Sequence, residues 1–363
     1  MRNTFGNNLT VTLFGESHGE AIGVVLDGIT AGISVDIENI KKMLSLRKGI
    51  SEISTPRREE DNFKIISGVF EGKTTGSPLC IVIPNEDTRS KDYSATKDLA
   101  RPSHADFTAE CKYNGFQDYR GGGHFSGRIT APIVALAGII IPALEKKGIY
   151  IGSHIYKCGG YTDNEFYNFK SDIQALNKKE FAVLNEDIGK DMINAIKAVK
   201  AEGDSIGGVV ETAIIGLPAG IGEPWFDSME SMLSHAVFSI PAVKGLEFGA
   251  GFSFADMKGS VANDGFENTD GKIHTKTNNS GGINGGISNG MPLVFRTAFR
   301  PTPTISKPQE TVNIKTGENV LLEAKGRHDP CIVHRAKVVV DSITAITLAD
   351  MLITRYGIDW LGE

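Results

Sequence analysis

Residues 118–130 read DYRGGGHFSGRIT and run directly into an apolar segment, Ala131–Gly148. This segment has the features of a helix, with Pro132 in its first turn, two lysines near its end and glycine as its last residue. Its apolar side chains lie almost all round the helix, so both faces should be buried. The fold is therefore expected to enclose this helix on both sides.

The loop before the helix combines three successive glycines, Gly121–Gly123, with Arg120 and Arg128 on either side and His124 and Ser126 between. Glycine lets backbone N–H groups approach a ligand, and arginine adds a fixed, fork-shaped positive charge. Such a loop at a helix N-terminus indicates a cradle for an anion or a phosphate. A tight surface turn is the alternative that this loop alone leaves open.

Composition and charge describe an ordinary soluble chain with an excess of glycine. Of 363 residues, 40% are hydrophobic, 23% are charged and 42 are glycine, which gather in a few loops as functional loops on a rigid scaffold do. The net charge of −6 argues against a broad nucleic-acid-binding surface. Arginines nevertheless cluster, which favours a small anionic ligand; the clusters are Arg57 with Arg58, Arg120 with Arg128, and Arg327 with Arg335.

The four cysteines, Cys80, Cys111, Cys158 and Cys331, form no CxxC pair and no zinc-ligand spacing, so we expect neither a metal site nor disulfides. The N-terminal residues show no export signal. The longest apolar run, Ala131–Leu144, contains two prolines and is too short to span a bilayer. We therefore expect a protein of the cytoplasm that binds neither membrane nor nucleic acid.

Alternation and helical spacing predict several further elements. The polar, basic stretch Arg47–Glu60 is expected to be a mobile surface loop that presents Arg57 and Arg58. The expected strands are Thr10–Phe14, Ile22–Leu26, Phe63–Val69 and Leu79–Pro84, and the expected helices are Asp36–Leu46, Ala131–Gly148, Lys190–Glu202 and Asp341–Tyr356.

A weak internal repeat links the two parts of the chain. Three matches occur in the same order, and they favour a single domain over residues 1–363 with two repeated halves, approximately 1–180 and 190–350. If the duplication is real, the buried helices lie between two sheets; chance matches between glycine-rich turns are the alternative. The matches are GEAIGVV from Gly19 with GDSIGGVV from Gly203, DGITAGI from Asp27 with IGLPAGI from Ile215, and GSPL from Gly76 with GMPL from Gly290.

Two common phosphate-binding motifs do not fit the loop at Gly121–Gly123. A Walker loop needs a lysine and a hydroxyl residue after its last glycine, where this chain has Arg128 and Ile129. A dinucleotide fingerprint needs a third glycine where this chain has Ser126, and no strong strand precedes the loop. A cradle for a phosphate-bearing cofactor or substrate remains.

Three histidines lie in polar, turn-rich segments. His18 is in GESHGE, His104 is in RPSHADF, and His328 begins the HDP step of GRHDPC. Histidine is the natural proton donor near neutral pH, so these residues are candidates for proton transfer; solvated loop residues and an Asp-Pro turn are the alternatives. Ser280–Gly290 is a second glycine-rich loop, and Arg300–Ile305 is a rigid, hydroxyl-bearing segment.

A series of short motifs occurs in order along the chain: GESHGE, TPRRE, SGVFEGKTTGSP, RSKDYS, RPSHADF, DYRGGG, GDSIGG, PAGIGEP, AVKG, GGINGGISNG and GRHDPC. From about Thr4 to about Leu352 this set resembles the chorismate synthase family. The resemblance implies an α+β fold, a three-layer β-α-β sandwich with internal duplication, assembled as a homotetramer. It implies the 1,4-anti elimination of phosphate from 5-enolpyruvylshikimate 3-phosphate to give chorismate, with reduced FMN required despite no net redox change.

The resemblance also implies roles for individual residues. His18 would protonate the departing phosphate, His104 would protonate the reduced flavin, and Asp329 would help the flavin nitrogen take up the ring hydrogen. Substrate anions would be bound by Arg47, Arg57, Arg128 and Arg335. FMN contacts would fall on His124, Phe125, Ser126, Pro241, Ala242, Gly285, Arg300, Pro301, Thr302, Pro303, Thr304 and Arg327.

Several positions depart from the usual family pattern. The arginine-rich segment of the family is LRKGISE here, with Glu52 near the place of a later arginine, and His124 and Phe125 stand where the family usually has arginine and serine. The protein either reduces its own flavin with NADPH or depends on a separate flavin reductase, and the altered segment favours the reductase. A degenerate flavin-binding relative and a different flavin oxidoreductase are the rival functions.

Overall fold

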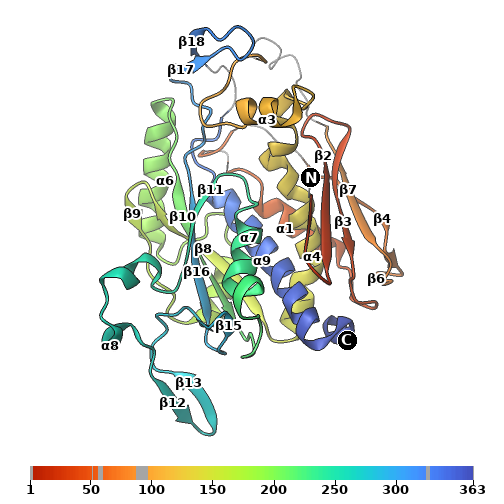
Figure 1. Ribbon diagram of the computed structural model, residues 1–363, viewed down its shortest axis with the longest axis vertical. Helices are drawn as coiled ribbons and strands as arrows, with labels where there is room; N and C mark the ends of the chain where they lie inside the picture. The colour runs from red at the N-terminus through yellow and green to blue at the C-terminus, as the bar shows by residue number, and fades with distance from the viewer. Residues whose placement is uncertain (1–2, 51, 56–59, 87–96, 324–327, 363) are drawn as a thin grey trace.

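The computed structural model describes residues 3–50, 52–55, 60–86, 97–323 and 328–362. Its centre is a pair of helices, α4 (Thr130–Lys146) and α9 (Val333–Tyr356), which pack against each other between two antiparallel sheets (Figure 1). Almost every residue of α4 is buried because the helix is apolar all round. In α9, burial extends from the first residue to Ile353, with Arg335 half-buried.

The first sheet comes from the N-terminal part of the chain. The side chains of β7 alternate between buried and half-buried positions, so one face of this sheet packs on the helices. Helix α1 (Ile37–Leu46) begins after Asp36, whose carboxylate accepts hydrogen bonds from two amides of the first turn, and it packs against α4. The strand order is β1 (Thr4–Phe5), β2 (Thr10–Gly15), β3 (Ala21–Asp27), β7 (Leu79–Pro84) and β4 (Lys64–Ser67).

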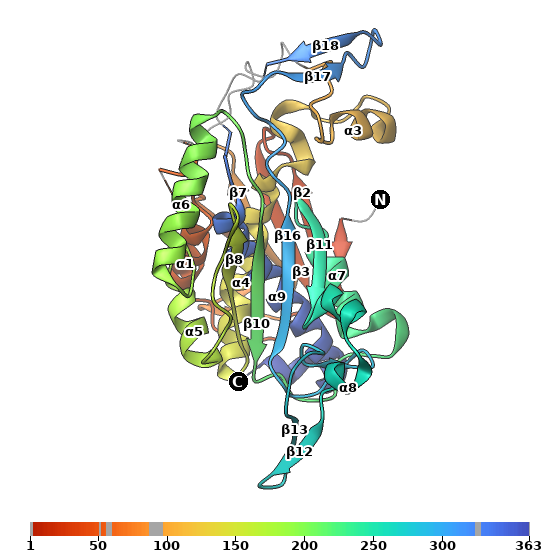
Figure 2. The same ribbon diagram turned by 90° about the vertical axis from the view of Figure 1, so that its left-hand side faces the viewer.

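The second sheet covers the other side of the helix pair. Its inner face carries a polar link to α9, because Ser153 Oγ donates a 2.5 Å hydrogen bond to Asp341 and lies 2.7 Å from Thr212 Oγ1. Helices α5 (Phe169–Leu176) and α6 (Glu186–Ala201) flank this sheet on its β8 and β9 side (Figure 2). The strand order is β11 (Val243–Phe248), β16 (Leu293–Phe299), β10 (Gly208–Ile215), β8 (Tyr150–Cys158) and β9 (Tyr161–Thr162).

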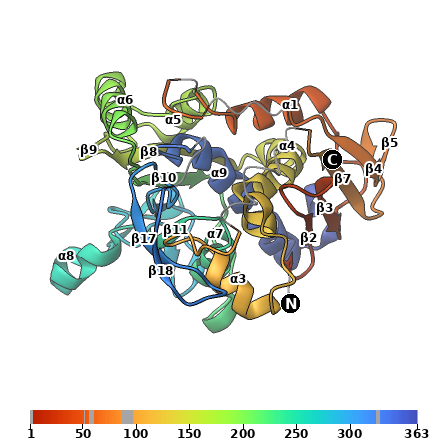
Figure 3. The ribbon, with the colours of Figure 1, turned by 90° about the horizontal axis from the view of Figure 1, so that it is seen from above.

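Short hairpins and further helices surround the two sheets, and the view from above shows α3 beside β17 and β18 (Figure 3). The hairpins are β5 (Val69–Phe70) with β6 (Lys73–Thr74), β12 (Phe266–Thr269) with β13 (Lys272–Thr275), β14 (Ile283–Asn284) with β15 (Ile287–Ser288), and β17 (Gln309–Val312) with β18 (Asn319–Leu322). The further α-helices are α3 (Asp106–Tyr113), α7 (Met229–Val237) and α8 (Gly259–Ala262). The 3-10 turns are η1 (Arg120–Phe125), η2 (Gly127–Ile129), η3 (Trp225–Asp227), η4 (Gly251–Asp256) and η5 (Ile358–Leu361).

The predicted α+β sandwich, with helices between two sheets, is confirmed, and most element boundaries shift by only a few residues. Helix α1 ends at the predicted Leu46, whereas α6 begins four residues earlier than predicted because Asn185 caps its first turn. Helix α9 begins eight residues before the predicted Asp341, at Val333. The predicted strand Phe63–Val69 is divided between β4 and the separate β5–β6 hairpin.

The predicted burial of the apolar helix is confirmed, although the helical stretch is longer than expected, and the prediction for the stretch 47–60 needs correction. The apolar helical stretch Gly127–Lys146 has 20 residues, long enough to cross a bilayer, but 89% of its apolar window is buried inside the fold, as in a core helix. The stretch 47–60 is not simply a surface loop, because Arg47, Ile53 and Ser54 are buried. Its residues Arg57 and Arg58 lie outside the described part of the chain.

Candidate functional site

The loop at Gly121–Gly123 is built around backbone positions that only glycine fits. All three residues have positive φ angles, of 60°, 85° and 53°. A Cβ atom at Gly121 would lie 2.1 Å from Cε1 of His18, and one at Gly122 would lie 3.3 Å from Cε1 of His104. The two predicted catalytic histidines therefore pack on adjacent glycines. We call these five residues the triglycine cluster.

The turn between β2 and β3 carries His18 and is fastened to the same loop. The backbone amide of Ser17 donates a 3.1 Å hydrogen bond to the carbonyl of Gly123. The hydroxyl of Ser17 lies 3.0 Å from Nδ1 of His18 and 3.1 Å from the carbonyl oxygen of Gly121. His18 itself is only 7% exposed, so its imidazole is held in one place against the glycines.

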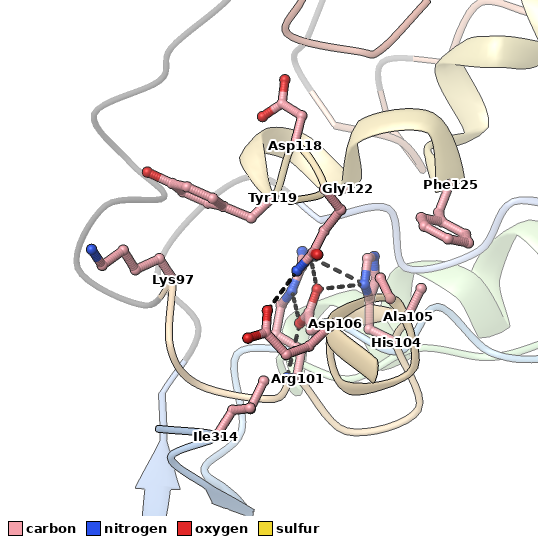
Figure 4. Close-up of a pocket in the computed structure, with 13 residues that line it drawn as sticks. Lys97, Arg101, His104, Ala105, Asp106, Asp118, Tyr119, Gly122, Phe125 and Ile314 are labelled. Carbon is pink, nitrogen blue, oxygen red and sulfur yellow. Dashed lines mark hydrogen bonds and ion pairs between the residues drawn. The ribbon is translucent and has the colours of Figure 1, made fainter. Parts of the chain in front are cut away.

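His104 lies just before α3, at a cavity that Gly122 also lines (Figure 4). Its Nδ1 lies 3.0 Å from Oδ1 of Asp106 and 3.1 Å from a guanidinium nitrogen of Arg101. Arg101 also holds both carboxylate oxygens of Asp106, at 2.7 and 2.8 Å. Burial alone would raise the pKa of Asp106, but hydrogen bonds from Arg101 and His104 hold that pKa well below its usual range, so Asp106 is a carboxylate.

The β17–β18 hairpin fixes the segment that precedes His104. The amide of Ala100 donates to the carbonyl of Val312 at 3.1 Å, and the amide of Ile314 donates to the carbonyl of Asp98 at 2.8 Å. Ile314 lines the cavity beside His104. Contacts between segments about 200 residues apart thus build this side of the site.

A second group of side chains contains three of the predicted substrate arginines, Arg47, Arg128 and Arg335. Arg47 lies at the end of α1, and its guanidinium is 2.9 Å from Asp61; Arg128, just before α4, pairs with the other oxygen of Asp61. Arg47, Asp61 and Arg128 are all buried. Burial would raise the pKa of Asp61, but the positive charges of Arg47 and Arg128 hold it below its usual range.

Asp329 and Arg335 extend this group at the start of α9. Their side chains form a 2.5 Å ion pair, and Arg335 also donates to the carbonyl of Arg47 at 3.0 Å. The amide of Thr55 donates to the second oxygen of Asp329 at 2.9 Å. Burial, together with the charge of Arg47, lowers the pKa of Arg335, and Asp329 opposes that shift. We call Arg47, Asp61, Arg128, Asp329 and Arg335 the arginine network.

Asn85 joins the triglycine cluster to the arginine network. Its amide nitrogen donates to the carbonyls of Glu16 and Gly19, at 2.9 and 3.0 Å, in the turn that carries His18. Its amide oxygen accepts a 3.1 Å hydrogen bond from Nε of Arg128. A single side chain therefore sets the distance between the histidine turn and the buried arginines.

The cations of the arginine network surround the beginnings of both central helices. Arg128 precedes α4, and Arg335 lies in the first turn of α9, where the helix dipole is positive and a cation is unfavourable. Nε of Arg47 is buried and lacks a hydrogen-bond partner among the described residues. This excess of positive charge and an unused donor are suited to an anionic ligand.

The predicted cofactor residues next to the glycines contribute local structure as well as surface. Nδ1 of His124 lies 2.7 Å from the carbonyl oxygen of Gly15, and the hydroxyl of Ser126 accepts from the amide of Arg128 at 3.3 Å. The ring of Phe125 is 41% exposed and lines the cavity beside His104. His124 and Ser126 therefore shape the loop, and Phe125 offers an open aromatic surface.

The segment Arg300–Thr304 follows the end of β16 and is fixed by the loop before β10. The hydroxyl of Ser205 donates to the carbonyl of Thr302 at 2.7 Å, and the neighbouring amide of Ile206 donates to the carbonyl of Pro330 at 2.8 Å. The loop therefore brings Arg300–Thr304 close to the segment that carries Asp329. The hydroxyl of Thr302 is buried and has no hydrogen-bond partner within the described residues.

The remaining predicted cofactor residues are not all brought together. Ala242, beside Pro241, has a positive φ of 75°, and its carbonyl accepts from the amide of Arg300 at 3.0 Å. Gly285 lies in the β14–β15 turn, before β16 begins, so the length of that strand separates it from Arg300 (Figure 1). Arg327 and Arg57 lie outside the described residues.

Sequence reasoning missed the carboxylates and the amide that organise the arginines and His104. Asp106 follows His104 within the same motif, at a spacing that places it in the first turn of α3. Asp61 and Asn85 are far from Arg128 in sequence, so only the fold brings them together. Within the described part of the chain, no group of three or more His, Cys, Asp or Glu side chains could hold a metal ion.

Comparisons with known proteins agree on one family. Residues 9–353 match the model of the family described as chorismate synthase. A chorismate synthase of Dehalococcoides mccartyi is 46% identical over 359 residues, which cover 99% of this chain and 98% of that protein. One from Korarchaeum cryptofilum is 43% identical, over 95% of this chain and 96% of its own. A crystal structure of a chorismate synthase superposes with a TM-score of 0.76 at 28% identity, covering 97% of this chain and 94% of its own.

Proposed function

The chain belongs to the chorismate synthase family, and we propose that its triglycine cluster and arginine network hold reduced FMN and the phosphorylated substrate of that enzyme. The enzyme is a lyase that removes phosphate from 5-enolpyruvylshikimate 3-phosphate to give chorismate, the final step of the shikimate pathway. The observation that carries the residue assignment is the packing of His18 and His104 on two adjacent glycines.

The described residues around the loop fit a phosphate-bearing aromatic cofactor. Thr302 offers a buried, unused hydroxyl, Phe125 offers an open ring, and Arg300 adds a positive charge on the same segment as Thr302. The glycines allow backbone to approach a flat ring closely. When bound, reduced FMN supplies electron density to the substrate and regains it with the ring hydrogen. We propose FMN contacts at His124–Ser126, Pro241, Ala242 and Arg300–Thr304; those at Gly285 and Arg327 rest on the family resemblance.

The two histidines are proposed to hold protons for two different groups, the departing phosphate and the reduced cofactor. Nδ1 of His18 contacts the hydroxyl of Ser17, so we assign the proton for the departing phosphate to its Nε2. Nδ1 of His104 is bonded to Asp106, so we assign the proton for the cofactor to its Nε2. Asp329, held by Arg335 and Thr55, is proposed as the carboxylate beside the hydrogen that leaves the ring.

The arginine network is proposed to bind the anionic groups of the substrate. Arg47 and Arg128 share the carboxylate of Asp61, and Arg335 pairs with Asp329, so three cations face two carboxylates and the network keeps an excess of positive charge for an anion. The unused Nε donor of Arg47 and the positive ends of α4 and α9 favour that anion. Arg57 is proposed as a further contact on the strength of the family resemblance.

We propose that the protein works as a homotetramer in the cytoplasm. The arm formed by η4, α8 and the β12–β13 hairpin projects from the body (Figures 1 and 2). Several apolar side chains of this arm are exposed, which is typical of an oligomer contact. They are Phe252 (82% exposed), Val261 (65%), Phe266 (65%) and Ile273 (71%).

We also propose that the two halves of the single domain are structural repeats. The repeated motifs at Gly19 and Gly203 lead into β3 and β10, which are the middle strands of the two sheets. The repeated motifs at Gly76 and Gly290 lead into β7 and β16, each of which pairs antiparallel with that middle strand. The equivalent positions support duplication over chance.

An anaerobic assay with reduced FMN and 5-enolpyruvylshikimate 3-phosphate tests the residue roles. Chorismate absorbance and phosphate release should rise together for the unmodified protein, with no net loss of reductant. His104→Ala should still bind FMN, measured by flavin fluorescence, and should lose about a hundredfold or more in turnover. Ordinary turnover by His104→Ala would show that His104 is a bystander, and reductant consumed in step with product would favour an oxidoreductase.

The source of electrons for the flavin is tested separately. We propose that the protein depends on a separate flavin reductase, because Glu52 stands near the place of a family arginine and pairs with Lys197 of α6. With NADPH as the only reductant, the anaerobic reaction should give no chorismate until a flavin reductase is added. Product formed from NADPH and FMN alone would contradict this dependence.

A further inference from the structure

The environment of the His104 ring is asymmetric in a way that bears on its proton. The imidazole is contacted at Nδ1, which faces both a donor, Arg101, and an acceptor, Asp106. The other ring edge is turned toward Gly122, where a Cβ would lie 3.5 Å from Nε2. One nitrogen is therefore committed to the protein and the other faces the cavity (Figure 4).

The two partners of Nδ1 act in opposite directions. A carboxylate can only accept a hydrogen bond, so Asp106 contacts Nδ1 favourably when that nitrogen is protonated. A guanidinium can only donate, so Arg101 contacts Nδ1 favourably when that nitrogen is unprotonated. Nδ1 thus has a partner in every state of the ring: Asp106 accepts from a protonated Nδ1, in the imidazolium or in the neutral tautomer whose Nε2 is bare, and Arg101 donates to a bare Nδ1, in the neutral tautomer whose proton lies on Nε2.

The geometry of Asp106 and Arg101 is itself strongly fixed. Arg101 binds both carboxylate oxygens of Asp106 through its side chain and also donates its backbone amide at 3.0 Å. Asp106 lies in the first turn of α3, where the helix dipole favours a negative charge. The pair is only about one-fifth exposed, so solvent screens its charges weakly.

We infer that Asp106 and Arg101 are positioning residues that together hold the ring of His104 through Nδ1, bias its protonation with opposite charges, and leave Nε2 facing the cavity beside Gly122. This inference rests on the proposed role of His104 in the elimination. Asp106 and Arg101 place opposite charges beside Nδ1, so removing one charge should affect the protonation of the ring in the opposite direction from removing the other. Neither residue is required to touch substrate or cofactor.

Other ionisable groups surround the same cavity and would contribute to any pH profile that is measured there. Those lining the cavity are Lys97, Glu110, Asp118 and Tyr119, and His18 faces the neighbouring glycine. Glu110 is paired with Lys315, and Asp118 is paired with Arg120. Asp118, which lines the cavity and is held by Arg120, is therefore a matched control for Asp106, which contacts Nδ1 of His104.

The test measures the proton of His104 directly, without cofactor or substrate. Diethylpyrocarbonate modifies only the unprotonated imidazole nitrogen, and mass spectrometry of the peptide that carries His104 gives its rate at each pH. In Asp106→Asn the midpoint of this reactivity profile should fall by about one pH unit, and in Arg101→Gln it should rise by about one pH unit. Asp118→Asn should leave the midpoint where it is in the unmodified protein.

Turnover adds a second readout. In Asp106→Asn, kcat at neutral pH should fall about tenfold while KM for the substrate changes little, because proton supply and not binding is affected. Midpoints that stay unchanged, or that move in the same direction in both variants, would overturn the inference. If Asp106→Asn fails to fold by circular dichroism, Arg101→Gln decides alone, since a midpoint that does not rise contradicts it.

The outcome can be separated from that of the proposed function. Normal turnover by His104→Ala would remove the catalytic role of His104, yet the two opposite shifts in reactivity would still be observed if Asp106 and Arg101 control its proton. Conversely, loss of turnover in His104→Ala with unmoved reactivity profiles would leave the catalytic role intact and reject the positioning role.

Discussion

The triglycine cluster and the arginine network are neighbours built on different physical principles. In the cluster, His18 and His104 approach backbone that has no Cβ atoms, so the contacts depend on shape. In the network, Arg47 and Arg128 are held by the buried carboxylate of Asp61 and Arg335 by the half-buried Asp329, so the contacts depend on charge. Substitutions should therefore damage the two regions in different ways: added volume should disturb the triglycine cluster, and lost charge should disturb the arginine network.

Gly121→Ala should have the largest effect, and it tests whether the triglycine cluster depends on shape. The new methyl group would lie 2.1 Å from the His18 ring at a φ of 60°, so the ring or the loop must move. Because displacements of about 1 Å can cost about a hundredfold in rate, we expect at least that loss in chorismate formation. Gly127→Ala is the matched control, since nothing lies within 4 Å of its Cβ position, and it should keep ordinary turnover.

Asp61→Asn tests whether the arginine network depends on charge, and it should act mainly on stability. Removing the shared carboxylate leaves Arg47 and Arg128 buried without their counter-ion, which should cost about 3–5 kcal/mol in the free energy of unfolding. Urea unfolding followed by circular dichroism measures this cost. Asp118→Asn, whose partner Arg120 is 39% exposed, should cost less than about 1 kcal/mol. Equal costs in the two variants would remove the distinction between buried and exposed pairs.

His334, whose neighbour Arg335 belongs to the arginine network, gives this region of the protein a pH dependence. Burial, with the charge of Arg335, lowers the pKa of His334 to about 4, whereas the unfolded chain binds this proton below about pH 6.5. The contribution of neutral His334 to stability is therefore full above pH 6.5 and is lost as the pH falls toward 4, by about 2 kcal/mol at pH 5. The difference in unfolding free energy between pH 7 and pH 5 should shrink by that amount in His334→Gln.

The exposed His274, paired with Glu267, supplies the control for this measurement. His274→Gln should keep the loss of stability between pH 7 and pH 5 that the unmodified protein shows. If His334→Gln also keeps the full loss, the buried histidine is not its source. Asp61 does not interfere, because its lowered pKa affects stability only below about pH 4.

Glu52→Gln should have the smallest effect and marks the edge of the arginine network. Glu52 and Lys197 form an ion pair on the surface, with side chains 65% and 45% exposed. Exposed pairs contribute little, so kcat/KM should stay within about twofold of the unmodified protein. A loss of tenfold or more would show that this departure from the family pattern has become part of the substrate site.

Much of the triglycine cluster could be predicted from the sequence, because a run of glycines indicates a tight loop directly. The loop at Gly121–Gly123, the histidines His18 and His104, and the buried helix after the loop were all expected from local residues. The apolar pattern of that helix also predicted its burial on both faces. The start of α9 was missed because Val333–Val340 carries His334, Arg335 and Lys337, whose polarity hides a buried helix.

The arginine network could be predicted only in part. The arginines were expected to bind anions, but the carboxylates that hold them were not, because Asp61 lies in a polar stretch with no signal of its own. Asp61 pairs with Arg128 across 67 positions, and Arg335 contacts Arg47 across 288. Such pairs are set by how the sheets and helices pack, which composition and local spacing do not encode.

The coupling between Gly121 and His18 tests the central claim most directly. Chorismate formation with reduced FMN, followed without oxygen, should be compared for His18→Ala, Gly121→Ala and the double variant. If the glycine acts by positioning His18, the double variant should be about as slow as the slower single variant. Losses that multiply in the double variant would contradict the account, because Gly121 and His18 would then act independently.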